Sequence, residues 1–152
     1  MTDPDRNELD AVRAAFNEIA ADYLGRVDDL PALNYDAARE ALAGFQRSLP
    51  SEGIGAEAAL RELYENGLPA TGTTSGPRFF HWVVGGSTPA AMGADWLTTL
   101  LDNPSYAWVG SPLTVELEIL SLEWLKDLFG LHEDMTGVMV TGASMANFVG
   151  MA

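Results

Sequence analysis

The chain has 152 residues, 47% of them hydrophobic and 20% charged, a balance typical of a globular protein. Twenty-two acidic residues against eight basic ones give a formal net charge of −14, which repels nucleic-acid backbones and anionic membrane surfaces. Cysteine is absent, no apolar run has the length of a membrane span, and the acidic N-terminus is unlike a signal peptide. We therefore expect a soluble cytoplasmic protein that binds neither nucleic acid nor membrane.

The first half of the chain has the periodicity of helices. Apolar residues recur every three or four positions from Leu9 to Val27, with Asp3 as the expected N-cap of this helix. Two more helices are predicted at about 35–48 and 56–66. The sequence thus begins with a mostly helical region.

Two later helices are predicted from a shared start signal, a hydroxyl residue followed by proline. The first begins in the sequence STP at Ser87 and runs to about Leu101, and the second begins at Ser111 and runs to Gly130. Apolar residues nearly encircle the second helix, which indicates packing on more than one side.

The last sixteen residues, GVMVTGASMANFVGMA, have the pattern of a strand, a tight turn and a helix. The β-branched, apolar run at 138–140 predicts the strand, and Gly142, Ala143 and Ser144 form the turn. Backbone N–H groups at such a turn favour an anion, above all phosphate. A plain tight turn with Ser144 as a helix cap is the alternative that the residues alone leave open.

One predicted strand cannot form a sheet, because each of its edges needs a hydrogen-bonding partner. The final helix also lacks a stop signal before Ala152. We therefore expect the chain to be the N-terminal portion of something larger, or one piece of a divided protein.

Three blocks of the sequence carry a resemblance to a known family: PRFFHWVVGGSTPAAMGADWL, YAWVGSPLTVELEILSLEWLKDLFGL and GVMVTGASMANFVGMA. Their order and spacing resemble the amino-terminal part of the pyridoxal-phosphate-dependent group II amino acid decarboxylases, over about residues 24–152. The resemblance implies an α/β fold, the fold type I large domain of PLP-dependent transferases. Residues 1–76 would be its N-terminal helical arm, which wraps a dimer partner, and 77–152 the start of its cofactor-binding domain, with the first strand and the phosphate-binding turn.

The resemblance also assigns the anion at the turn. It implies that Gly142, Ala143 and Ser144 bind the 5′-phosphate of pyridoxal phosphate. Two positions depart from the family pattern: Met145 stands where the family usually has Glu, and Val115 where it usually has Thr. Both lie in first turns of predicted helices, so they alter capping and local charge more than phosphate contacts.

By the same resemblance, Trp82 and Val83 line the substrate side of the pocket, and Tyr106 reaches the site of a neighbouring subunit. Core packing is the alternative for all three side chains. The aromatic residues around these positions favour an aromatic amino acid over glutamate as the substrate.

The chain contains a single lysine, Lys126, whereas the family needs a lysine that forms a Schiff base with the cofactor. Lys126 follows Glu123 by three residues, a spacing typical of a solvated ion pair on a helix face. The family's Schiff-base lysine lies downstream of the part that this chain resembles. We therefore expect no catalytic residue here and no activity from this chain alone.

Other polar residues have simpler interpretations. His81, set among aromatics, is expected to be a packed, hydrogen-bonded core residue, and His132 to lie in a surface loop. Neither belongs to a metal-binding pattern, so no metal site is predicted. Glu116 and Glu118 are two residues apart on a helix and should point to different faces, which argues against a pair of acid and base.

The resulting hypothesis is a PLP-dependent decarboxylase, a lyase that releases CO2 from an L-amino acid. Its partners would be a downstream segment or second chain carrying the Schiff-base lysine, and a second complete unit in a homodimer. One alternative is a non-catalytic helical interaction or regulatory fragment. Another is carbon–carbon lyase chemistry by the same cofactor on another substrate.

Overall fold

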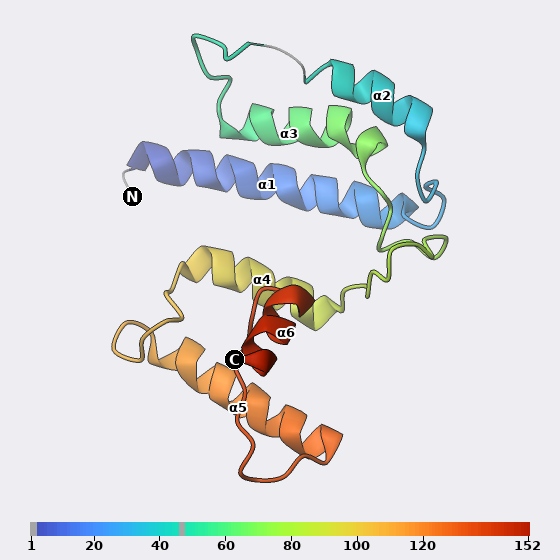
Figure 1. Ribbon diagram of the computed structural model, residues 1–152. Coiled ribbons are helices and arrows are strands. Elements are labelled where there is room, and N and C mark those ends of the chain that lie inside the picture. The colour runs from blue at the N-terminus through green and yellow to red at the C-terminus, as the bar shows by residue number, and fades with distance from the viewer. Residues whose placement is uncertain (1–2, 46–47) are drawn as a thin grey trace. The chain divides into compact units, whose positions relative to one another are not determined.

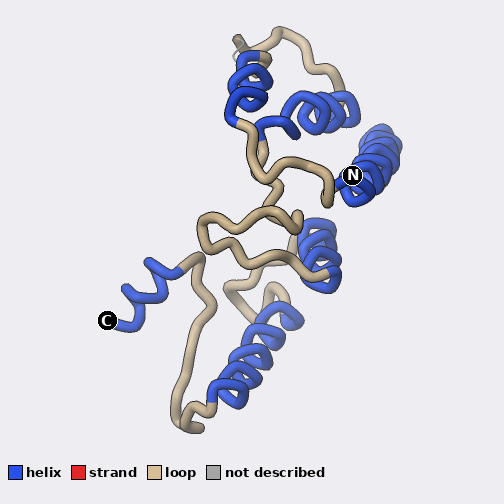
Figure 2. Tube along the Cα trace, turned by 90° about the vertical axis from the view of Figure 1, so that its right-hand side faces the viewer, coloured by secondary structure: helices blue, strands red, loops and turns tan. Residues whose placement is uncertain are grey.

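The computed structural model describes residues 3–45 and 48–152, and the chain divides into two compact units, Met1–Ser87 and Thr88–Ala152. Across these described residues every regular element is a helix, and no strand forms (Figures 1 and 2). The elements are α1 (Asp3–Arg26), α2 (Tyr35–Ala43), α3 (Ala56–Gly67), the 3-10 helix η1 (Leu68–Ala70), α4 (Pro89–Leu101), α5 (Pro112–Phe129) and α6 (Ala143–Met151).

In the first unit, α1 lies side by side with α3 (Figure 1). The face of α1 that packs is the predicted apolar stripe, with Ala15 fully buried on it. Arg61 of α3 donates to Glu18 of α1 at 2.8 Å and to Glu57 at 2.9 Å, so a polar bridge runs along the edge of the helix pair. Helical periodicity alone therefore predicted the packing face correctly.

The loop after η1 is tied to the loop between α1 and α2. Thr73 is buried there, and its hydroxyl donates to the Pro31 carbonyl at 2.8 Å while its amide donates to the Ala32 carbonyl at 3.0 Å. These two bonds satisfy the polar groups that burial of a threonine would otherwise leave unpaired.

Helix α2 is shorter than the sequence indicated. Asn34 caps its start by accepting from the Ala37 amide at 3.1 Å, and the helix ends at Ala43 instead of about 48. Residues 46–47 of the predicted span lie outside the described residues, and Ser48 is in a loop. Gly44 explains the early end, because glycine in a helix interior costs about 1 kcal/mol relative to alanine.

In the second unit, α4 and α5 begin and end close to the predicted positions, although the Ser111 side chain makes no cap bond at the start of α5. Thr88 accepts from the Ala91 amide at 3.2 Å, ahead of Pro89 in the first turn. Helix α4 closes at Asp102 in the left-handed region, with φ 46°, and α5 closes at Gly130 with φ 63°. Glycine reaches this region without the steric cost that a β-carbon brings.

The predicted strand at 138–140 is wrong for this structure, since the segment is a loop (Figure 2). A strand exists only when a neighbour completes its hydrogen-bond ladder, and the described parts of the chain supply no second strand. The Met139 amide donates instead to Glu118 Oε1 at 3.1 Å. The expected α/β architecture therefore appears here as helices alone.

Candidate cofactor-binding site

The turn before α6 presents three amides with no acceptor inside the helix. Gly142 is the N-cap residue, with φ 136° and ψ 168°, a conformation that glycine adopts without strain. The first helical bond runs from the Ala146 amide to the Gly142 carbonyl at 3.0 Å. The amides of Ala143, Ser144 and Met145 therefore precede the hydrogen-bond ladder of the helix.

These groups suit a phosphate. The three amides and the positive end of the α6 dipole meet at one place, and the exposed Ser144 hydroxyl makes no hydrogen bond within the described residues. A β-carbon built on Gly142 would meet nothing within 4 Å, so no described atom crowds that side of the turn. The residues present thus fit the phosphate of the cofactor that the sequence blocks imply.

No charged side chain occurs between residues 135 and 152. The turn therefore offers an anion neither an opposing carboxylate nor a cation from this stretch. Hydrogen-bond donors and the helix dipole are the means by which this segment can hold a phosphate.

The proposed substrate-pocket residues are exposed. Trp82 is 83% exposed, Tyr106 is 89% exposed, and Val83 is fully exposed, so core packing, the alternative for these side chains, is not what the structure has. Trp82 and Val83 also have left-handed backbones, with φ 62° and φ 54°. Such angles are uncommon for a β-branched residue, and they mark this loop as strained.

The candidate residues are distributed over both units. Trp82 and Val83 belong to the first unit, whereas Tyr106 and the turn belong to the second. Within the described part of the second unit, no hydrogen bond joins Tyr106 to the turn. The pocket that the resemblance implies stays a prediction for these three residues.

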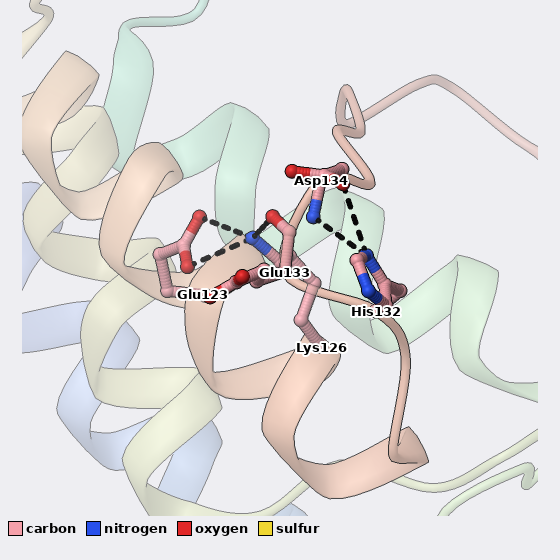
Figure 3. A network of polar contacts seen from close by, with 5 residues as sticks. All are labelled: Glu123, Lys126, His132, Glu133 and Asp134. Atoms are coloured by element: carbon pink, nitrogen blue, oxygen red, sulfur yellow. Dashed lines mark hydrogen bonds and ion pairs between the residues drawn. The ribbon is translucent and has the colours of Figure 1, made fainter.

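His81 is not the packed core residue that its aromatic neighbours suggested. Its side chain is exposed, and its ring meets Phe79 edge-on with centroids 5.7 Å apart. His132 does lie in a loop, as predicted, with Nδ1 3.3 Å from Asp134 Oδ2 (Figure 3). In the described ranges, no group of three histidine or acidic residues lies close enough to hold a metal ion.

Lys126 is engaged more fully than a solvated helix-face residue would be. Its ammonium donates to both carboxylate oxygens of Glu123, at 3.1 and 3.0 Å, and to the Glu133 carbonyl at 3.0 Å (Figure 3). The pairing with Glu123 was predicted, but the side chain is only 16% exposed. An ammonium has three N–H donors, and all three have acceptors here.

Glu116 and Glu118 point to different partners, as their spacing predicted. Glu116 accepts from the Trp108 indole N–H at 2.9 Å, and Glu118 accepts from the Met139 amide at 3.1 Å. Each carboxylate therefore ties a different loop to α5, one before the helix and one after it.

A polar groove on the first unit was missed by sequence reasoning. It has a volume of about 420 Å³ and lies between α1 and α3, with Arg61 and Tyr64 in its lining. The hydrogen bond to Glu18 raises the pKa of Arg61, and burial together with a bond to Asp22 raises that of Tyr64. The spacings of four residues from Asp22 to Arg26 and from Glu57 to Arg61 could have indicated part of this network.

Comparison with known proteins defines the family. The family described as the pyridoxal-dependent decarboxylase conserved domain matches residues 41–152. The chain belongs to this family, as its three sequence blocks predicted, and the cofactor of the family is pyridoxal phosphate. No helix in the described residues is both long and apolar enough to span a membrane.

Curated relatives share about a quarter of their residues with the chain over the matched region. Tryptophan decarboxylase 1 of Oryza sativa subsp. japonica is 23% identical over 75% of this chain and 22% of its own length. Aromatic-L-amino-acid decarboxylase of Bacillus atrophaeus is 26% identical over 68% of this chain and 22% of its own length. Tyrosine decarboxylase 2 of Narcissus pseudonarcissus is 23% identical over 87% of this chain and 28% of its own length.

The chain thus spans less than a third of the length of these relatives. No solved structure matches it.

Proposed function

We propose that the chain is the N-terminal part of a PLP-dependent amino acid decarboxylase and that its turn at 142–144 anchors the phosphate of the cofactor. The observation that carries the proposal is the start of α6, which has no side-chain cap and lies inside the matched region, at the turn that the resemblance assigns to the phosphate. A phosphate at a helix start needs backbone amides that have no other acceptor, and a side of the turn that no side chain blocks.

The contribution of this chain is to bind and orient. The amides of Ala143, Ser144 and Met145, with the Ser144 hydroxyl, hold the phosphate and so fix one end of the cofactor. When bound, pyridoxal phosphate supplies an electron sink that makes loss of CO2 from the α-carbon of an amino acid possible. Fixing the cofactor at one end limits the orientations of its ring and favours reaction by proximity.

Trp82, Val83 and Tyr106 form part of the substrate pocket wall in the complete enzyme. Their exposure here leaves large apolar surfaces available for a ligand or a neighbouring segment. The substrate is an L-amino acid, and an aromatic one is favoured, in keeping with the tryptophan and tyrosine decarboxylases among the relatives.

The Schiff-base lysine comes from a downstream segment or a second chain. Lys126 is unsuited to this role because its ammonium is held in an ion pair and by a backbone carbonyl. The complete unit adopts the fold type I large domain, forms a homodimer with the helical arm of 1–76 crossing between subunits, and acts in the cytoplasm.

The experiment is to purify the natural particle through a tag on this chain, then measure its mass and visible spectrum. We expect a second, lysine-containing segment, the absorbance of bound pyridoxal phosphate and release of CO2 from an aromatic amino acid. A colourless particle without cofactor would contradict the proposal and favour the non-catalytic fragment. Bound cofactor with carbon–carbon cleavage but no CO2 would favour the alternative lyase.

A further inference from the structure

Helix α5 carries a stripe of three side chains along one face. Glu118, Leu122 and Lys126 are spaced by four residues, so they project from the same side of the helix. All three are half-buried, whereas most of the helix is exposed. This face is therefore partly covered, and the covering segment is the loop that follows the helix.

The covering segment runs antiparallel to the stripe. Lys126, near the end of α5, bonds the Glu133 carbonyl at 3.0 Å, and Glu118, near its start, bonds the Met139 amide at 3.1 Å. Later residues of the segment thus meet earlier residues of the helix.

Leu122 makes the middle contact of the stripe. A methyl group added to Gly137 would lie 3.1 Å from Leu122 Cδ2, which is tighter than an ordinary contact. Glycine at 137 therefore lets the backbone lie close against the helix. The contacts from all three stripe residues fix both the register and the height of the segment above α5.

We propose that Glu118 and Lys126 are positioning residues for the phosphate-binding turn, an inference that rests on the proposed function. Only two residues separate Met139 from Gly142, so the bond from Glu118 restricts where the turn can lie. The Met139 amide donates to Glu118 Oε1 at 3.1 Å, so the carboxylate holds the backbone three residues before Gly142. Lys126 fixes the other end of the segment.

The chemistry of the two contacts suits this role. A bond between a carboxylate and a backbone amide, or between an ammonium and a carbonyl, is charge-assisted and stronger than a neutral one. Neither residue reaches the phosphate in our assignment, so each acts through the backbone that presents the turn amides.

Glu116 provides a matched control. It is a glutamate on the same helix, and it also accepts one N–H bond, but from the Trp108 side chain in the preceding loop. Glu116→Ala should therefore perturb α5 to a similar degree without touching the segment at 133–139.

The test compares Glu118→Ala, Glu118→Gln, Lys126→Met and Glu116→Ala in the complete lysine-containing assembly. Two quantities are measured: the dissociation constant of pyridoxal phosphate, and amide hydrogen exchange in peptides covering 137–146. We expect Glu118→Ala and Lys126→Met to raise the dissociation constant about five- to tenfold and to speed exchange at the turn. Glu118→Gln keeps an acceptor oxygen, so its dissociation constant and its exchange rate at the turn should be close to those of wild type. Glu116→Ala should match wild type in both quantities.

Wild-type affinity and exchange in both Glu118→Ala and Lys126→Met would overturn the positioning role, as would an equal effect of Glu116→Ala. If Glu118→Ala does not fold, Glu118→Gln and Lys126→Met still decide the matter. A wild-type assembly that binds no pyridoxal phosphate would overturn the proposed function instead, and hydrogen exchange would then decide whether the two residues position the turn.

Discussion

At the turn before α6, backbone amides and one hydroxyl are the groups that this chain offers to a phosphate. Side-chain size should therefore matter as much as side-chain chemistry. A hydroxyl adds one donor to those that the backbone already supplies, whereas a bulky side chain obstructs access to all of them.

We predict that Ser144→Ala weakens pyridoxal phosphate binding modestly, by about 1 kcal/mol for one lost hydrogen bond, and that Ala143→Leu weakens it more. Titration of the cofactor into the complete assembly measures both. Ser121→Ala is the control, because the Ser121 hydroxyl donates to the Leu117 carbonyl within α5 at 2.6 Å. Unchanged affinity in both turn variants would refute the phosphate assignment.

A second residue-scale prediction concerns Tyr64, whose hydroxyl donates to Asp22 across the α1 and α3 pair. Burial and this bond raise the pKa of Tyr64 above its ordinary value of 10.0, so the folded state favours the neutral phenol. Its stabilising contribution is present below pH 10 and is lost as pH rises through the raised pKa.

Tyr64→Phe should therefore remove this loss of stability in alkali and leave a flatter stability profile between pH 9 and about 11. Denaturant unfolding of the complete assembly across this range measures it. Tyr35→Phe serves as the control, since the Tyr35 side chain is exposed. Identical profiles for wild type and Tyr64→Phe would show that Tyr64 contributes nothing to the pH dependence.

At the scale of elements, boundaries set by local chemistry were predictable. The Thr88 cap before α4 and Gly130 after α5 act within one turn of the chain, so sequence alone located these ends. The strand at 138–140 was not predictable in this way, because a strand depends on a distant partner.

The hydrogen-bond partners of side chains were even harder to predict from the sequence. The spacing of Glu116 and Glu118 predicted different faces, but which loop returns to each face is decided by tertiary structure. The exposure of His81 was missed for the same reason, since aromatic neighbours in sequence do not have to surround a residue in space.

The cap of α4 gives an element-scale prediction. Thr88→Ala should destabilise the helix by about 1 kcal/mol, because the Ala91 amide loses its acceptor, while Thr88→Ser should retain most of the stability. Hydrogen exchange of the α4 amides in the complete assembly measures this locally. Equal exchange in the alanine and serine variants would show that the cap is dispensable.

At the scale of the molecule, most of the large apolar side chains in the described residues are exposed to solvent. Ala15 is the one apolar side chain that is buried among the described residues, and large side chains on α5 such as Trp124 and Phe129 are more than 60% exposed. Hydrophobic burial is the main stabilising term in folding, so this chain alone has little of it.

We therefore predict that residues 1–152 expressed alone will be aggregated or molten, and that with the lysine-containing segment they will form a dimer of complete units. Size-exclusion chromatography with light scattering and a thermal melt test the isolated chain. A monodisperse monomer that melts cooperatively would show that the chain does not depend on a partner.

The antiparallel contact between α5 and the segment after it has a consequence for folding order. Its polar bonds join residues only 7 and 21 positions apart, so closing these loops costs little entropy. Contacts of short sequence separation form quickly, whereas sheet pairing with distant strands is slow. The turn should thus acquire its shape early, before the slower strand pairing of the proposed complete unit.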